Sequence, residues 1–324
     1  MSGRRPILIT GASGFIGSHL ARRIASTGRK VVGTCTAPHT AWRLRDLPSN
    51  FVLEVIDLRN TASMQALFAE HRFGEVFHLA AHGVQTSGGP TVKDASETTS
   101  VNTLGSLALG QAALRHGVDR FTHCGSGFEY RWQDGPVNES APLGAPNLYG
   151  ASKAAGWCLL EGLRRSEGLP LTTVRPFAVF GPVESDQKLI PYVIARALRR
   201  ETLRLSTGDQ IRDFVYVADV VDALLLAATS ESAVGRVFNI GSGPAEARTI
   251  RQLVETALEM VGAPMSLCQF GEARRLRADP PCLVSDSTCA VAQLGWRPRV
   301  SLQEGLSRTI RSIASAASKS VAAA

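Results

Sequence analysis

The segment Ile7-Leu-Ile-Thr-Gly11-Ala-Ser-Gly14-Phe-Ile-Gly17 decides the fold of this chain. Its apolar start predicts a buried strand, and three glycines at three-residue intervals predict a tight turn into a helix. Glycine lets the backbone approach a pyrophosphate closely, and the free N–H groups and dipole of a helix N-terminus favour that anion. We therefore predict a dinucleotide-binding turn; the simpler alternative is a glycine-rich turn that only packs a helix on a sheet.

Short apolar runs alternate with helical stretches through the first half of the chain. We expect strands at 7–10, 30–34, 51–55, 76–79, 120–124 and 171–175, and helices at 18–27, 61–71, after Val101 and at 149–167. This alternation predicts an α/β fold with a Rossmann-type, doubly wound parallel sheet. Residues 1–176 form the predicted dinucleotide-binding domain.

The pattern becomes less regular after Pro176. We expect helices at 189–200, 219–229, 250–261 and 302–313, a strand at 237–240, and an irregular segment over 264–296. These elements predict a smaller mixed α/β domain over 177–311 that holds mainly the substrate, with segments around 210–241 returning to the first domain. The tail 312–324 is small, repetitive and expected to fray.

Composition excludes several classes of protein. The chain has 324 residues, 44% hydrophobic and 19% charged, which excludes a disordered or low-complexity architecture. The net charge of +7 is scattered and accompanied by no nucleic-acid-binding motif, so it fits an anionic small ligand better than nucleic acid. No apolar run is long enough to span a membrane. The six cysteines form no Cys-x-x-Cys pair, which predicts reduced thiols and a cytoplasmic protein.

A second set of residues carries chemistry. Tyr149 and Lys153 are spaced i, i+4 near the start of a helix and therefore share one face. The lysine ammonium is expected to lower the pKa of the phenol from about 10, so that Tyr149 can exchange a proton with a hydroxyl–carbonyl pair during hydride transfer. Ser126 follows a strand, and its hydroxyl can hydrogen-bond the reacting oxygen.

Together these motifs resemble those of the extended short-chain dehydrogenases/reductases, within the nucleotide-sugar epimerase/dehydratase family. The resemblance extends over roughly residues 6–310. Besides the glycine turn it rests on Asp57-Leu58, His78-Leu-Ala-Ala81, Asn102, Ser126, Tyr149-x-x-x-Lys153, Arg175-Pro-Phe177, Arg212-Asp-Phe-Val-Tyr-Val217 and Phe238-Asn-Ile-Gly241.

The resemblance implies a role for each matching position. The dinucleotide would be lined by Gly11, Gly14, Phe15, Ile16, Gly17, Asp57, Leu58, Leu79, Ala80, Ala81, Asn102, Tyr149, Lys153 and Phe177. Ser126 and Tyr149 would hold the C4 oxygen of the sugar, and Lys153 would bind the nicotinamide ribose. The substrate diphosphate would be contacted by Arg212, joined by Arg275 or Arg277; the alternative for Arg212 is an ion pair with Asp209 or Asp213. The resemblance also implies a homodimer formed through the helices after Val101 and from Tyr149.

The loop after the second strand bears on the choice of cofactor. An NAD site usually carries an acidic residue there for the ribose 2′-hydroxyl, whereas this chain has none before Asp46. Thr36, His39 and Arg43 can instead meet a 2′-phosphate, which favours NADP over NAD. Asp57 is placed either to contact the adenine or to cap a helix.

Departures from the family narrow the reaction. Dehydratases of the family resemble Thr-Asp-Glu where this chain has Ser126-Gly127-Phe128, so the acid and base for water elimination are missing. Phe128 also stands where the fucose-synthase type has a cysteine, and Ala178 where 4-epimerases often have an asparagine. Keto reduction or epimerisation at C4 of a nucleotide-diphosphate sugar remains.

We predict a 4-ketoreductase of deoxysugar biosynthesis with Tyr149 as the proton donor. One alternative is an NAD-dependent 4-epimerase. Another is a non-catalytic, dinucleotide-binding regulatory protein, although such a protein would have no chemical need for Ser126, Tyr149 and Lys153. His78 and His82 have no evident third partner, so no metal site is predicted.

Overall fold

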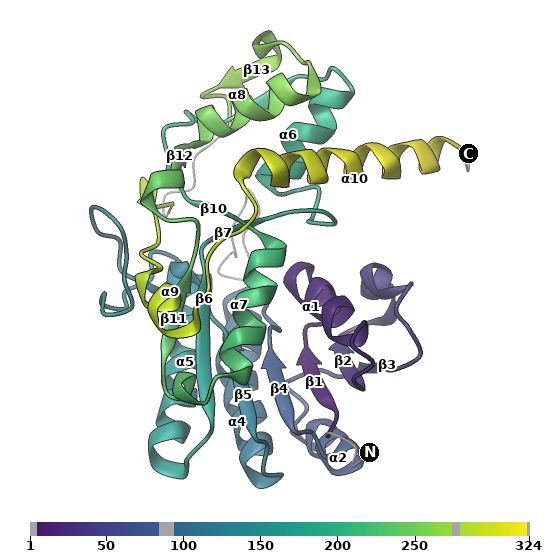
Figure 1. Cartoon of the computed structure of the whole chain (residues 1–324), viewed down its shortest axis with the longest axis vertical. Coiled ribbons are helices and arrows are strands. Elements are labelled where there is room, and N and C mark those ends of the chain that lie inside the picture. The colour runs from purple at the N-terminus through teal and green to yellow at the C-terminus, as the bar shows by residue number, and fades with distance from the viewer. Residues whose placement is uncertain (1–4, 84–93, 274–278, 323–324) are drawn as a thin grey trace.

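A computed structural model describes residues 5–83, 94–273 and 279–322. Its centre is a seven-stranded parallel sheet with the strand order β11-β6-β5-β4-β1-β2-β3 (Figure 1). The strands are β1 (Ile7–Thr10), β2 (Val31–Cys35), β3 (Phe51–Val55), β4 (Glu75–His78), β5 (Arg120–Cys124), β6 (Leu171–Pro176) and β11 (Val237–Ile240). The predicted doubly wound Rossmann-type sheet is confirmed. Its order reverses between β1 and β4, which opens a crevice at the carboxyl ends of the strands.

Helices cover both faces of the sheet (Figure 1). One face packs against α1 (Phe15–Ala25), α7 (Val217–Thr229) and α9 (Thr288–Leu294), and the other against α2 (Thr61–His71), α4 (Ser106–Arg115) and α5 (Leu148–Glu167). Strand residues alternate between the two resulting cores: Ile7 and Ile9 lie in the first core and Leu8 in the second. Burial on both sides suits the apolar strand β1, whereas β4, β5 and β6 also contain buried polar residues such as His78, His123 and Arg175.

A further layer lies beyond the carboxyl ends of the strands (Figure 1). It contains α6 (Leu189–Leu198), α8 (Ile250–Val261), α10 (Leu302–Ala322), and the pair β8 (Leu203–Leu205) and β13 (Cys268–Phe270). Short strands join it to the main sheet: β7 (Ala178–Phe180) pairs with β10 (Phe214–Tyr216), and β9 (Ile211–Arg212) lies between β12 (Arg248–Thr249) and β14 (Cys282–Leu283). Between β10 and β12 the chain returns to the main sheet as β11, which lies beside β6.

Short helical segments complete the described chain. They are α3 (Ala95–Thr99), the π-helical stretch η3 (Ser100–Gly105), and the 3₁₀ helices η1 (Pro38–Leu44), η4 (Gly127–Glu129), η5 (Glu231–Ala233), η6 (Pro244–Glu246) and η7 (Met265–Leu267). None of the helices in the described ranges is long and apolar enough to cross a membrane. All six cysteines are free thiols, as the sequence predicts.

One expectation for the C-terminal part is wrong, and one stays a prediction. The tail from Ser312 is predicted to fray, and in the structure α10 continues to Ala322. The start of α10 is held by an apolar face, with Leu302 and Leu306 buried and Ile310 and Ile313 packed beside them. The segment 264–296 was expected to be irregular, but it includes α9 and two very short strands, which are too brief to give a periodic signal.

Candidate active site at the carboxyl ends of the parallel strands

The glycine turn has the geometry needed to hold a pyrophosphate. Gly11 adopts a left-handed φ of +69°, and a Cβ at this position would lie 2.7 Å from the backbone of Ala80. A Cβ on Gly17 would lie 2.2 Å from the carbonyl oxygen of Gly11. Gly14 is the N-cap of α1 and has no side chain that could accept from the first N–H groups of the helix. The residues present therefore fit a dinucleotide, with Phe15 and Ile16 in the first turn of the helix.

The segment after β4 is fixed beside this turn. The backbone N–H of Leu79 donates to the Thr10 carbonyl at 3.2 Å, and that of Ala80 donates to Thr10 Oγ1 at 3.3 Å. Asn102, which is 1% exposed, accepts from the N–H of His82 at 2.8 Å and donates to the carbonyl of the same residue at 2.9 Å. Asn102 thus braces the segment containing Ala81 through both ends of its amide.

Arg43 reaches the glycine turn from η1. Its Nη1 donates to the carbonyl of Ser13 at 3.2 Å, and its Nε donates to the carbonyl of Val183 at 2.8 Å. Thr40 Oγ1 lies 3.4 Å from Ser13 Oγ, while Thr36 is exposed just after β2. Arg43 is therefore brought to the glycine turn.

Asp57 and Leu58 follow β3. Both carboxylate oxygens of Asp57 accept from Arg59, at distances between 2.6 and 2.9 Å. The Arg59 hydrogen bonds hold the pKa of Asp57 below its ordinary value. Leu58 is buried, and a Cβ added to Gly105 would lie 2.9 Å from the Cβ of Leu58. The pairing with Arg59 was not anticipated from the sequence.

The turn after β5 presents Ser126. This residue caps η4: its hydroxyl accepts from the N–H of Phe128 at 3.2 Å, and its own N–H donates to Glu129 Oε1 at 2.7 Å. Glu129 is fully buried and forms a 2.7 Å ion pair with Arg175. A Cβ on Gly127 would lie 3.0 Å from the ring of Phe177, which places this ring against the turn.

Helix α5 brings Tyr149 to Ser126. Asn147 caps the helix by accepting from the N–H of Gly150 at 2.8 Å. A Cβ on Gly150 would lie 2.1 Å from the carbonyl oxygen of Phe128, so only glycine lets α5 start this close to the turn. The Ser126 side chain is close enough to Tyr149 to act on the phenol and lower its pKa. The structure therefore brings the two predicted hydroxyls together.

The electrostatics of this group differ from expectation. Burial raises the pKa of Tyr149 above its ordinary value, Cys124 and Glu129 act in the same direction, and only the hydrogen bond with Ser126 lowers it. The predicted lowering of the Tyr149 pKa by Lys153 is therefore wrong for the protein without bound ligands. Lys153 is 2% exposed, and its Nζ lies 3.3 Å from His123 Nε2. Its own pKa is lowered by burial.

The nearby Cys124 and His78 are structural residues. Burial raises the pKa of Cys124 to about 11, so its thiol stays protonated, in agreement with the predicted core role. His78 is fully buried between Thr10 Oγ1 and Ser106 Oγ, each 2.8 Å from a ring nitrogen. The described residues contain no group of three or more His, Cys, Asp or Glu side chains able to hold a metal ion.

The predicted substrate arginine is engaged within the protein. Arg212 Nη2 donates to Asp279 Oδ1 at 2.5 Å and to the carbonyl of Pro280 at 2.8 Å. The alternative partners Asp209 and Asp213 were wrong, because the chain folds Asp279 back beside β9 through the pairing of β14 with β9. Arg275 and Arg277 lie outside the described residues.

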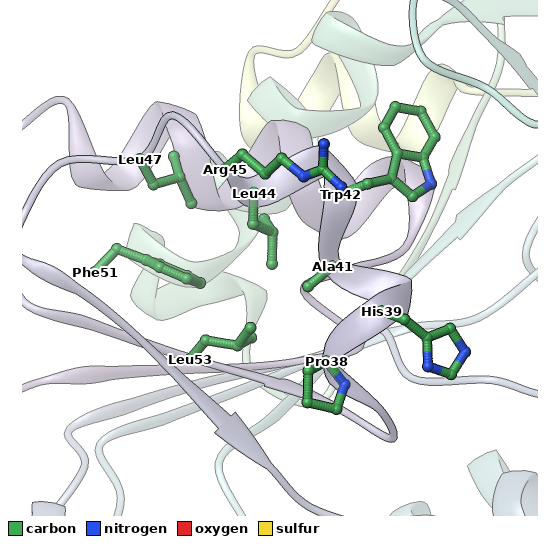
Figure 2. Close-up of a pocket in the computed structure, with 9 residues that line it drawn as sticks. All are labelled: Pro38, His39, Ala41, Trp42, Leu44, Arg45, Leu47, Phe51 and Leu53. Carbon is green, nitrogen blue, oxygen red and sulfur yellow. The ribbon is translucent and has the colours of Figure 1, made fainter.

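A pocket of about 370 Å³ lies between η1 and β3 (Figure 2). Leu44, Phe51 and Leu53 point into it, and Trp42 and His39 lie at its side (Figure 2). It is lined by Pro38, His39, Ala41, Trp42, Leu44, Arg45, Leu47, Phe51 and Leu53. None of the reacting side chains borders this pocket, so it is separate from the candidate active site.

Sequence reasoning missed Glu129 and His123. Ser126-Gly-Phe-Glu129 is a Ser-x-x-Glu pattern, which is the signal of a capping box and would have tied Glu129 to Ser126. His123 is a polar residue within a short buried strand, where a histidine is unusual enough to mark a specific partner.

The fold and the glycine turn place this chain among the dinucleotide-binding proteins of the Rossmann type. The group Ser126, Tyr149 and Lys153 lies beside that turn. The model of one family, described as the NAD dependent epimerase/dehydratase family, matches residues 7–241. The chain belongs to this family.

Known relatives span the whole chain. A UDP-glucose 4-epimerase of Mycolicibacterium smegmatis is 32% identical over 321 residues, which cover 94% of this chain and 96% of the relative. The crystal structure of a UDP-glucose 4-epimerase with UDP-glucose from Thermotoga maritima has a TM-score of 0.88 and 29% identity, covering 96% of this chain and 99% of its own. A dTDP-glucose 4,6-dehydratase from Streptomyces venezuelae, with NAD bound, has a TM-score of 0.87 and 26% identity, covering 96% and 97%. The predicted preference for NADP finds no support in these comparisons.

Proposed function

We propose that this protein is an NAD-dependent 4-epimerase of a nucleotide-diphosphate sugar. The observation that carries the proposal is the close approach of α5 to the Ser126 turn, where a Cβ on Gly150 would lie 2.1 Å from the carbonyl oxygen of Phe128, with Tyr149 and Lys153 one helical turn apart on α5. A site with two neighbouring hydroxyls and a buried lysine suits reversible proton exchange at one secondary alcohol. The 4-epimerases among the relatives support C4 as the reacting carbon.

The chain's own residues supply the acid–base chemistry. Tyr149 takes the proton of the C4 hydroxyl as C4 is oxidised and returns it when C4 is reduced. Ser126 hydrogen-bonds the same oxygen and holds it beside the phenol. NAD held by the glycine turn would supply the hydride acceptor and donor and, in its oxidised form, a positive charge in the site. Because burial raises the pKa of Tyr149 and Lys153 is not among the groups that lower it, that charge would favour the phenolate.

The same turn argues against a 4,6-dehydratase. Water elimination needs an acid and a base close to the reacting hydroxyl. At the two positions after Ser126 this chain has Gly127, which has no side chain, and Phe128, which is apolar. Cys124 is protonated and Glu129 is tied to Arg175, so neither substitutes for the missing pair.

A 4-ketoreductase that uses NADPH is the second candidate. The residues between Cys35 and Asp46 include no carboxylate, and Arg43 is held against Ser13 of the glycine turn. A guanidinium placed there suits a 2′-phosphate, and a reductase must exchange its spent cofactor. The cofactor preference therefore separates the two reactions.

The experiment is to denature the purified protein, identify the released nucleotide by mass spectrometry, and titrate NADH and NADPH on the same batch. Tightly retained, stoichiometric NAD is expected for the epimerase. An exchangeable site that prefers NADPH would favour the ketoreductase. Failure to bind either nucleotide would overturn both candidates.

A further inference from the structure

The catalytic lysine contacts a buried imidazole that the proposed chemistry does not use. His123 lies on β5, is 0% exposed, and has its Nε2 3.3 Å from Lys153 Nζ. Its other nitrogen, Nδ1, is buried without a hydrogen-bond partner. An unpaired donor in the interior is unfavourable, and an apolar side chain in this place would not carry that cost. The imidazole therefore needs a compensating interaction, and Lys153 is the contact that provides it.

His123 belongs to a row of polar residues that crosses the sheet. Thr10 on β1 lies opposite His78 on β4, and His78 lies opposite His123 on β5. The two imidazole centroids are 5.6 Å apart. Ser106 Oγ donates to the Asn102 carbonyl at 2.6 Å, so it accepts from His78 Nε2, and His78 Nδ1 then accepts from Thr10. His78 is therefore neutral, and both of its ring nitrogens are hydrogen-bonded. Its ring packs beside the ring of His123.

The charge of Lys153 decides the tautomer of His123. The ammonium form of Lys153 can only donate, so with this form Nε2 accepts and the single proton of the neutral ring lies on Nδ1. Burial, followed by the charge of Lys153, holds the pKa of His123 well below its ordinary value, which agrees with a neutral ring. The two neighbouring histidines thus carry opposite tautomers.

We propose that His123 is a positioning residue that accepts an N–H of the Lys153 ammonium and holds this charge one helical turn from Tyr149. One N–H is then used by the imidazole, and the other two remain for the cofactor ribose and the phenol side of the site. The inference rests on the proposed function only in its activity test.

The charge of Lys153 sets the expected pH dependence. The titratable and charged groups around the pair are Cys124, Glu129, His78, Arg175 and, on α5, Tyr149. Burial disfavours the ammonium, and an acceptor hydrogen bond favours it. Removing the acceptor therefore lowers the pKa of Lys153 further. The fall in activity on the alkaline side of the pH profile then begins at a lower pH.

The test compares three full-length variants. His123→Phe keeps a ring and removes the acceptor, His123→Gln restores an acceptor oxygen, and His116→Phe makes the same ring change at a half-buried position over Phe68 and away from Lys153. With UDP-glucose as substrate we expect His123→Phe to lower kcat by up to roughly 100-fold and to move the alkaline limb down by about one to two pH units. His123→Gln should return that limb toward the wild-type position, and His116→Phe should leave it unchanged.

A second measurement does not depend on catalysis. In ¹⁵N-histidine-labelled protein, NMR should show His123 neutral with its proton on Nδ1, and Lys153→Met should change the Nε2 signal of His123 more than either signal of His78. A proton on Nε2, or a signal unaffected by Lys153→Met, would overturn the inference. If the NMR result holds but no sugar nucleotide is converted, the proposed function fails and the Lys153–His123 pairing stands.

Discussion

Two buried arginines, one in each half of the molecule, are paired in different ways. Arg175 of the main sheet is paired with Glu129 at 2.7 Å, and the side chains are 2% and 0% exposed. Arg212 of the outer layer is paired with Asp279 at 2.5 Å, and these side chains are 9% and 24% exposed. The first pair is closed to solvent, whereas the second has one partner at the surface. We expect that Arg175 holds the site together and that Arg212 exchanges its carboxylate for a substrate diphosphate.

The interior pair has further partners that the outer pair does not share. Arg175 Nη1 donates to Tyr130 Oη at 2.8 Å, and its guanidinium lies 4.7 Å from the centroids of the Tyr130 and Trp157 rings. Tyr130 Oη donates in turn to Asn239 Oδ1 on β11 at 2.8 Å. The network connects the turn that carries Ser126 to β11, the strand that returns from the outer layer.

The largest expected effect is on the interior pair. Glu129→Gln leaves the Arg175 charge buried without a counter-charge, so unfolding in urea should show a loss of about 3–5 kcal/mol. The control Glu304→Gln, in the exposed pair with Arg308 on α10, should leave the transition unchanged. A loss below about 1 kcal/mol for Glu129→Gln would mean that the interior pair is no more important than a surface one.

Asp213, the neighbour of Arg212, gives the next largest effect. It accepts from the N–H groups of Ser285 at 3.0 Å and Gly243 at 3.2 Å, and burial raises its pKa to about 6. Between about pH 4 and about pH 6 the folded chain keeps a proton that the unfolded chain releases, so stability falls as the pH rises. Over this range the wild type should lose roughly 3 kcal/mol more than Asp213→Asn. Parallel pH profiles of unfolding for the two proteins would contradict this assignment.

Arg212→Met tests the outer pair directly. If this guanidinium binds the diphosphate, KM for a sugar nucleotide should rise by about 10- to 100-fold, the loss expected for a hydrogen bond to a charged group, with a smaller change in kcat. Steady-state kinetics on UDP-glucose measure both. An unchanged KM would make Arg212 a structural residue like Arg175.

The smallest effect is expected from Asp279→Asn. The variant weakens the competition for Arg212, and because Asp279 is partly exposed the gain is small, so KM should fall by at most about fivefold. A rise in KM would show that Asp279 orients Arg212 and does not compete with the substrate for it.

The two halves also differ in how far the sequence predicts them. The strands of the main sheet contain apolar residues and alternate with helices along the chain, so β1, β3 and β5 could be placed directly, and Gly11, Ser126, Tyr149 and Lys153 follow from motifs with local spacing. The outer layer depends on strands of two or three residues that pair across large sequence separations, as β9 does with β14. Such strands give no periodicity, and for that reason the Arg212–Asp279 contact could not be predicted. The Lys153–His123 and Glu129–Arg175 contacts are tertiary in the same way.

The most direct test of the account follows the hydrogen at C4. The full-length protein is incubated with UDP- and dTDP-hexoses deuterated at C4, with NAD and in parallel with NADPH, and the products are analysed by mass spectrometry and NMR. The account predicts inversion at C4 with the deuterium retained there, and a rate reduced by roughly 10²- to 10⁴-fold in Tyr149→Phe. Inverted product that has lost its deuterium, or Tyr149→Phe turning over at the wild-type rate, would contradict it.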